Sequence, residues 1–153
     1  MRARARARCV AHAYEQVLEL QPNHAGAGEA IVRLKAMSGD SNAALSAIEA
    51  LAAKAQTGEQ KAEQWMRAAK LLEGLGDKDG AISRYKLALE ANPKDTTASA
   101  ELRAAYAARG DAMSVVELIE KELNNAGTNL AKARLHAELA RLQRNQLRDD
   151  AKA

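Results

Sequence analysis

The sequence contains no phenylalanine, one tryptophan, three tyrosines and one cysteine, and only two prolines interrupt its 153 residues. Scarce aromatic and β-branched residues leave little material for a buried sheet, whereas abundant Ala, Leu, Glu, Lys and Arg favour helices. The composition therefore predicts an all-α protein, in which a thin core of small side chains is spread over many helices.

The single cysteine, Cys9, cannot form a disulfide within the chain, which fits a reducing compartment. No apolar run reaches the roughly 18 to 20 residues that a membrane-spanning helix needs. The first eight residues are not followed by the apolar stretch of a secretory signal. We therefore expect a soluble, cytoplasmic protein that does not span a membrane.

The net charge of +3 comes from the N-terminal arginines Arg2, Arg4, Arg6 and Arg8, which have no acidic residue among them. The rest of the chain is close to neutral. A basic arm can pair with phosphates, but arginines that alternate with alanine at a chain end are more often solvated. Nucleic-acid binding is therefore not the expected function.

The dipeptide Gly-Asp occurs three times, at intervals of 37 and 34 residues. The three copies are Gly39-Asp40, Gly76-Asp77 and Gly110-Asp111. Each copy follows one stretch of helical periodicity and precedes another. Glycine accepts the left-handed conformation just past a helix end, and aspartate can cap the next helix by accepting backbone N–H bonds. The three dipeptides therefore predict the turns of three helical hairpins.

Two prolines mark a second type of boundary, at Pro22 and Pro93. Each ends a helix, because proline stops one helix and presets the start of the next. Aligning the two prolines places Tyr14 opposite Tyr85, eight residues before each. The chain therefore repeats a helical unit and not only a turn.

Around the middle turn the sequence reads Trp65-x2-Ala68-Ala69-x2-Leu72, then Ala81-x3-Tyr85, then Pro93. This pattern resembles the tetratricopeptide repeat, a 34-residue helical hairpin with the pattern W-x2-L-G-x2-Y, A-x3-F and P. Ala68, Ala69 and Leu72 depart from it, by exchanges that a helix contact can absorb. The resemblance implies an α-solenoid of antiparallel hairpins, wound as a right-handed superhelix with a concave groove.

The resemblance extends over nearly the whole chain and predicts about eight helices in a single solenoid domain, residues 1–153. The expected parts are a half repeat at 1–24, repeats at 25–61, 62–95 and 96–128, a closing helix at 129–148 and a tail at 149–153. The helix of the half repeat is expected at about 7–20. Three extra residues near 55–61 are expected to lengthen a loop.

A chain that begins with the second helix of a repeat leaves one side of that helix uncovered. The uncovered face would carry Val10, Tyr14 and Val17 instead of a polar cap. Either the chain continues a longer array, or this face meets another subunit. A third interpretation, in which the first helix simply frays, stays open.

Residues that could act as nucleophiles or metal ligands are few. Cys9 and His12 would share a helix face, but two ligands make a weak site and no further pair lies nearby in the sequence. His24 suits a turn and His136 suits a helix contact. Phosphate-binding loops and nucleophile elbows are lacking. We therefore expect no enzyme activity, no metal and no cofactor.

In tetratricopeptide repeats the first helix of each hairpin lines the groove, so the resemblance implies which residues would touch a partner. The matching positions are Glu29, Arg33, Met37, Met66, Arg67, Lys70, Glu101, Ala104, Arg134 and Arg141. Cations beside flexible methionines suit an extended or helical peptide with acidic groups. The carboxylate clamp of this family does not fit, because Arg33, Lys70 and Ala104 stand where asparagine is expected.

Two classes of function follow. The first is a non-catalytic interaction module, an adaptor or scaffold that binds a protein, peptide or partner helix in its groove. The second is a structural segment that self-assembles through its N-terminal helix face or continues a longer array. Reversing the charge of Arg33, Arg67 and Lys70 would abolish the first function, whereas acidic residues at Val10 and Tyr14 would abolish the second.

Overall fold

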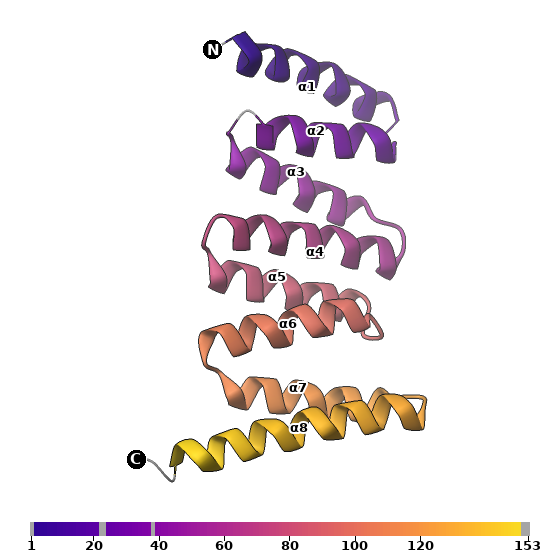
Figure 1. The fold of residues 1–153 in the computed structure, drawn as a ribbon. Coiled ribbons are helices and arrows are strands. Elements are labelled where there is room, and N and C mark those ends of the chain that lie inside the picture. The colour runs from indigo at the N-terminus through magenta and orange to yellow at the C-terminus, as the bar shows by residue number, and fades with distance from the viewer. Residues whose placement is uncertain (1, 22–23, 38, 151–153) are drawn as a thin grey trace. The chain divides into compact units, whose positions relative to one another are not determined.

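The computed structural model describes residues 2–21, 24–37 and 39–150. The regular secondary structure of these residues is entirely α-helical (Figure 1). The eight helices of the described residues are α1 (Arg2–Leu20), α2 (Ala25–Met37), α3 (Ser41–Lys54), α4 (Gly58–Gly74), α5 (Lys78–Ala91), α6 (Thr96–Arg109), α7 (Ala112–Asn125) and α8 (Asn129–Asp150). The prediction of an all-α chain of about eight helices is confirmed.

The chain divides into two compact units, unit 1 (residues 1–98) and unit 2 (residues 99–153). Unit 1 contains α1 to α5 and the first residues of α6, and unit 2 contains the rest of α6, α7 and α8. The single solenoid domain stays a prediction. Of the predicted features, Pro22, the side chains of Arg2, Arg4 and Arg8, and the tail beyond residue 150 lie outside the described residues.

Unit 1 is built from consecutive helices that run antiparallel and pack side by side (Figure 1). α1 contacts α2, α2 contacts α3, α3 contacts α4, and α4 contacts α5. Alanines fill much of the interior of α4 and α5, where Ala68, Ala69, Ala81 and Ala88 are fully buried. A methyl group at these positions lets neighbouring backbones approach closely, as the sequence predicts.

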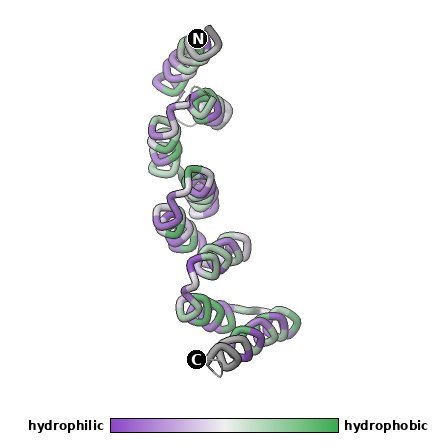
Figure 2. The backbone as a smooth tube through the Cα atoms, turned by 60° about the vertical axis from the view of Figure 1, so that its left-hand side comes forward, coloured by the Kyte–Doolittle hydropathy of each residue, from purple (hydrophilic) through white to green (hydrophobic). Residues whose placement is uncertain are grey.

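Hydrophobic and hydrophilic stretches alternate along the helices (Figure 2). This alternation is typical of helices that have one buried and one solvated face. Within the described part of the chain, every helix is too short or too polar to cross a lipid bilayer.

The three Gly-Asp turns share one geometry. Gly39, Gly76 and Gly110 have φ angles of 79°, 83° and 79°, in the left-handed region that glycine adopts without steric cost. The amide of Asp77 then donates to the carbonyl of Leu72, five residues earlier, at 3.0 Å, and the other two turns repeat this bond. Such a bond satisfies the last carbonyls of the preceding helix. The predicted hairpin turns are confirmed.

The aspartate of each turn caps the helix that follows. The carboxylate of Asp77 accepts from the backbone N–H of Gly80 at 2.9 Å. Asp40 and Asp111 accept in the same way from the residues three positions further on, at 2.9 and 3.1 Å. Each cap satisfies a backbone donor that the first helical turn leaves unpaired.

Two helices begin earlier than the sequence predicts. α4 begins at Gly58 because the hydroxyl of Thr57 caps it, accepting from the backbone N–H of Gln60 at 3.2 Å. The extra residues near 55–61 therefore lengthen a helix instead of a loop, and α4 has 17 residues where α2 has 13. α1 begins at Arg2, because alanine and arginine are both strong helix formers.

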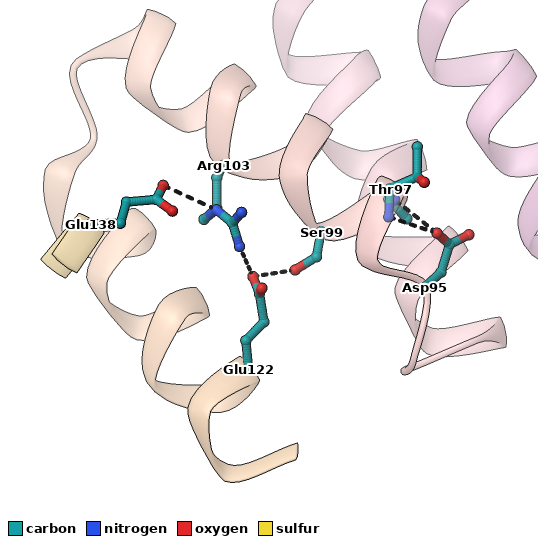
Figure 3. A network of polar contacts seen from close by, with 7 residues as sticks. Asp95, Thr97, Ser99, Arg103, Glu122 and Glu138 are labelled. Carbon is teal, nitrogen blue, oxygen red and sulfur yellow. Dashed lines mark hydrogen bonds and ion pairs between the residues drawn. The ribbon is translucent and has the colours of Figure 1, made fainter. Parts of the chain in front are cut away.

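Unit 2 contains a network of polar contacts that joins three helices (Figure 3). The guanidinium of Arg103 on α6 pairs with Glu122 on α7 and, at 3.3 Å, with Glu138 on α8. Glu122 also accepts a hydrogen bond from the hydroxyl of Ser99, which is buried. The side chains of Arg103 and Glu122 are only 15% and 21% exposed, so water screens this pair less than a surface pair.

Gly76→Ala should destabilise the protein by about 1 to 2 kcal/mol, because a Cβ is strained at a left-handed φ. The strain is in the backbone, since nothing lies within 4 Å of the added Cβ. Gly74→Ala is the matched control, because Gly74 is equally open but helical, and should be neutral or stabilise by up to about 1 kcal/mol. Urea unfolding measures both effects, and equal stabilities would contradict the role given to Gly76.

Candidate functional site

A pocket of about 320 Å³, here called the groove pocket, opens between α2 and α4 in unit 1, with α3 at its floor. Its lining residues are Glu29, Val32, Arg33 and Ala36 from α2, Ala44 and Ile48 from α3, and Arg67, Lys70 and Leu71 from α4. The groove pocket therefore brings together four residues that the sequence predicts to face a partner, Glu29, Arg33, Arg67 and Lys70.

Helical spacing explains why these residues share one surface. The four residues of α2 follow the spacing i, i+3, i+4 and i+7, which places them on one face of the helix. Ala44 and Ile48 lie one turn apart on α3, and both are buried. The floor is therefore apolar, and the small side chain of Ala44 leaves space above it.

The rim of the groove pocket carries three cations and one carboxylate. Arg67 on α4 donates to Glu29 on α2 at 3.1 Å and pairs with Glu63 at 3.3 Å. Arg33 is exposed and makes no hydrogen bond or ion pair with the other described residues. Two carboxylates match the charge of Arg67, whereas no described residue neutralises Arg33.

The two methionines that the sequence predicts at this site lie elsewhere. Met66 is only 9% exposed and belongs to the core, so its side chain is not available to a partner. Met37 is 69% exposed but does not line the groove pocket. Met66 precedes Arg67 on the same helix, where successive side chains point about 100° apart, and only Arg67 faces the pocket.

Most of the apolar lining of the groove pocket is missing from the sequence prediction. Val32 and Leu71 are direct neighbours of predicted cations, and helical spacing counted from Glu29 and Arg67 would have found them. Ala44 and Ile48 lie on the second helix of the hairpin, where the family resemblance places no partner contact. Their place at the floor follows from the packing of α3 beneath α2 and α4.

The remaining predicted groove residues belong to unit 2. Ala104, Arg134 and Arg141 are exposed, and Glu101 is half-buried. They are surface positions of α6 and α8, and they do not line either pocket of unit 1.

A second pocket, here called the Gly28 pocket, has a volume of about 150 Å³ and lies among α1, α2 and α3. It is lined by Glu15 and Leu18 from α1, Gly28, Ile31 and Lys35 from α2, and Ala47, Ala50, Leu51 and Lys54 from α3. Five of these residues are aliphatic, and the charged groups are one carboxylate and two ammonium groups. It shares no lining residue with the groove pocket.

Solved structures resemble this arrangement of hairpins. MamA is similar over 94% of this chain and 90% of its own, with 17% sequence identity and a TM-score of 0.54. A Podosopora anserina protein of kinesin light chain type, with nearly identical TPR-like repeats, is similar over 97% of this chain and 83% of its own, with 19% identity and a TM-score of 0.56. The chain has the tetratricopeptide-repeat fold. No protein-family model and no curated protein matches its sequence.

Within this tetratricopeptide-repeat fold, α5 is the second helix of a hairpin, and the sequence predicts the same role for α1. Tyr14 and Tyr85 each lie eight residues before a proline. Tyr85 is fully buried and donates to Glu73 at 3.0 Å, whereas Tyr14 is 36% exposed. Val10 is 45% exposed and Val17 is half-buried. The face formed by Val10, Tyr14 and Val17, here called the outer face of α1, therefore presents apolar side chains to solvent.

The candidate ligands and nucleophiles of the sequence are Cys9, His12, His24 and His136. Cys9 is exposed, and His12 lies 3.5 Å from Glu15. Nδ1 of His24 accepts from the backbone N–H of Ala27 at 3.1 Å, which confirms its predicted role in a turn. His136 is exposed, so its predicted helix contact is wrong. Among the residues that the structure describes, no group of three His, Cys, Asp or Glu side chains could hold a metal ion.

Glu15 on α1 and Lys35 on α2 form an ion pair at the mouth of the Gly28 pocket, 3.0 Å apart. The hydrogen bond from Lys35 lowers the pKa of Glu15 below its ordinary value, against the opposing effect of burial, and His12 adds to the lowering. Glu15 is therefore ionised at neutral pH.

Lys35→Gln should raise the pKa of Glu15 toward 4.5, its ordinary value, which an NMR titration of the carboxyl carbon measures. A lowered pKa in the folded state stabilises the protein at neutral pH, and this contribution is lost as the pH falls through that pKa. Because the carboxylate is 43% exposed, the contribution is below about 1 kcal/mol. An unchanged pKa in the variant would contradict the assignment of the lowering to Lys35.

Proposed function

We propose that this chain is a non-catalytic protein-interaction module that binds an acidic peptide, or a partner helix with acidic side chains, at the groove pocket. The observation that carries the proposal is the composition of that pocket, an apolar floor under a rim on which Arg33 and Lys70 are cationic. The fold supports the proposal, because stacked helical hairpins form extended binding surfaces.

The lining of the groove pocket defines the chemistry of the partner. A leucine-sized side chain of the partner would contact Val32, Ile48 and Leu71. Carboxylates next to that side chain would pair with Arg33 and Lys70, and the planar guanidinium of arginine can bind a carboxylate through two parallel hydrogen bonds. Arg67, already held by Glu29 and Glu63, would shape the rim more than it would bind the partner.

Reversing the charges of Arg33 and Lys70 on the rim should abolish binding. Peptides would be selected from a random displayed library on the wild-type chain at physiological salt, and their affinities measured by fluorescence anisotropy. The double variant Arg33→Glu with Lys70→Glu should bind the selected peptides at least about tenfold more weakly, because like charges would face each other. Arg67 is left unchanged, since a third carboxylate beside Glu29 and Glu63 would itself disturb the fold.

The matched control is Lys61→Glu with Lys121→Glu, which makes the same change of net charge at exposed residues outside the groove pocket. It should retain the wild-type affinity. An equal loss in both variants would show a general charge effect, and a selection that returns peptides without acidic residues would contradict the proposed partner.

A second candidate function is self-assembly through the outer face of α1. The observation that favours it is the contrast between Tyr14, partly exposed, and its counterpart Tyr85, which is fully buried. An apolar face of this kind is stabilised when a second chain covers it.

Under this second function, Val10→Asp with Tyr14→Asp should convert an oligomer into a 16.4 kDa monomer in sedimentation experiments, because charged groups would have to be buried at the contact. Met113→Asp with Leu130→Asp changes two other exposed apolar residues in the same way and should leave the oligomer intact. A wild-type chain that sediments as a monomer at every concentration would exclude this function. The groove variants should not alter the mass.

A further inference from the structure

The three hairpin turns have the same backbone geometry, so residues at equal distances from the turn glycine occupy equivalent places. The first helix carries Gly28, Trp65 and Ser99 eleven residues before the glycine of its own turn. These three residues differ greatly in volume and polarity, and the structure shows how each repeat fills the place.

In the second repeat the place is filled by an aromatic ring. Trp65 is half-buried, and the guanidinium of Arg84 lies over its ring, 5.7 Å from the centroid. Arg84 is held in turn by Glu49 on α3, at 2.5 Å. A cation over an indole face is a favourable electrostatic contact. Ring, cation and carboxylate therefore form one packed cluster.

In the third repeat the place is filled by polar groups (Figure 3). Ser99 donates to Glu122, twelve residues after the turn glycine, and Arg103 pairs with the same carboxylate. Ser99 is buried, and the side chains of Arg103 and Glu122 are mostly shielded. Here an internal network closes the space that a tryptophan occupies in the second repeat.

In the first repeat the equivalent place is left open, and it forms the Gly28 pocket. Gly28 has no side chain, and Ala47 stands where the second repeat has Arg84, eight residues after the turn glycine. A Cβ built on Gly28 would lie 2.6 Å from Cδ2 of Leu51, so Leu51 leans toward the glycine without filling the pocket. A volume of about 150 Å³ remains, bounded by five aliphatic side chains and by Glu15, Lys35 and Lys54.

We propose that the Gly28 pocket binds an aromatic side chain of a partner protein, with an acidic residue next to it in the partner's sequence. Trp65 in the equivalent place of the second repeat shows that the hairpin geometry accommodates a ring there. An apolar cavity of about 150 Å³ is large enough for benzene. The Gly28 pocket is smaller than typical small-molecule sites, which have volumes of about 300 to 1,000 Å³. It therefore suits one side chain and not a whole ligand.

The charges at the mouth of the Gly28 pocket specify the acidic neighbour. Glu15 and Lys35 are paired with each other. Lys54, at the end of α3, makes no hydrogen bond or ion pair with the other described residues. A carboxylate next to the bound ring would therefore meet the ammonium group of Lys54. This site is additional to the groove pocket and does not depend on binding there.

The test uses the full chain labelled with ¹⁵N and the probe N-acetyl-Phe-Asp-amide. Titration should shift the backbone amide signals of residues 28–35 and 47–54, with a Kd on the order of 1 mM for so small a probe. N-acetyl-Ala-Asp-amide, which lacks the ring, should cause no such shifts. Lys54→Gln should weaken binding of the phenylalanine probe several-fold by removing the cation.

Gly28→Ala should weaken binding of the phenylalanine probe by about tenfold or more, because the new methyl group pushes Leu51 into the pocket. Gly26→Ala is the matched control on the same helix, where a Cβ meets only the ring of His24 at an ordinary 3.4 Å. Ala47→Leu fills the pocket from α3 instead, so the test does not depend on how Gly28→Ala folds.

Three results would overturn the proposal. The first is equal binding by the Gly28→Ala, Ala47→Leu and Gly26→Ala variants. The second is an absence of shifts at residues 28–35 and 47–54 in the wild-type chain. The third is binding of free 3-phenylpropionate about tenfold or more tighter than the peptide probe, since the occupant would then be a small molecule.

Discussion

Each hairpin depends on a chain reversal in the left-handed region, made by a glycine and followed at once by an aspartate that starts the next helix. This turn fixes the rotation of the second helix against the first. An α-helix turns by about 100° per residue, so a slip of one position would carry a core side chain to the surface. The alanine contacts, the floor of the groove pocket and the equivalence of the three repeats all follow from this one turn.

Ion pairs join helices that are two apart in the order of the chain. Arg67 on α4 reaches Glu29 on α2, and Arg84 on α5 reaches Glu49 on α3. These side chains are about one quarter to one half exposed, and pairs of this kind contribute little to stability. Burial of Ala, Ile and Tyr side chains supplies most of the stability, while the ion pairs favour one alignment of successive hairpins over others.

The fold could be predicted from local signals. The Gly-Asp turns and the pattern from Trp65 to Pro93 consist of residue types that a particular backbone geometry requires. Helix starts were less predictable, since the cap at Thr57 outweighs the low helix propensity of Gly58.

Only part of the candidate site could be predicted from the sequence. The rim residues Arg33, Arg67 and Lys70 follow from position on the first helices. Met66 does not, because one step along α4 turns it into the core. Both pockets depend on a small residue, Ala44 in the groove pocket and Gly28 in the Gly28 pocket. Each leaves a space that the neighbouring side chains do not fill. That space depends on how three helices pack, which the pattern of a single helix does not contain.

The guanidinium of Arg103 on α6 pairs with carboxylates on α7 and α8. The local stabilities of the three helices are therefore coupled. When α8 separates from the rest of unit 2, Arg103 loses Glu138 but keeps Glu122, so a charge-matched pair survives. When α7 separates, Arg103 and Ser99 both lose Glu122, and a largely buried cation is left with one half-exposed carboxylate. In terms of these charged groups, detachment of α8 alone therefore costs less than detachment of α7. The amide hydrogens of α8 should exchange with solvent through a low-energy opening of that helix alone. The amide hydrogens of α6 and α7 should exchange only when both helices open together.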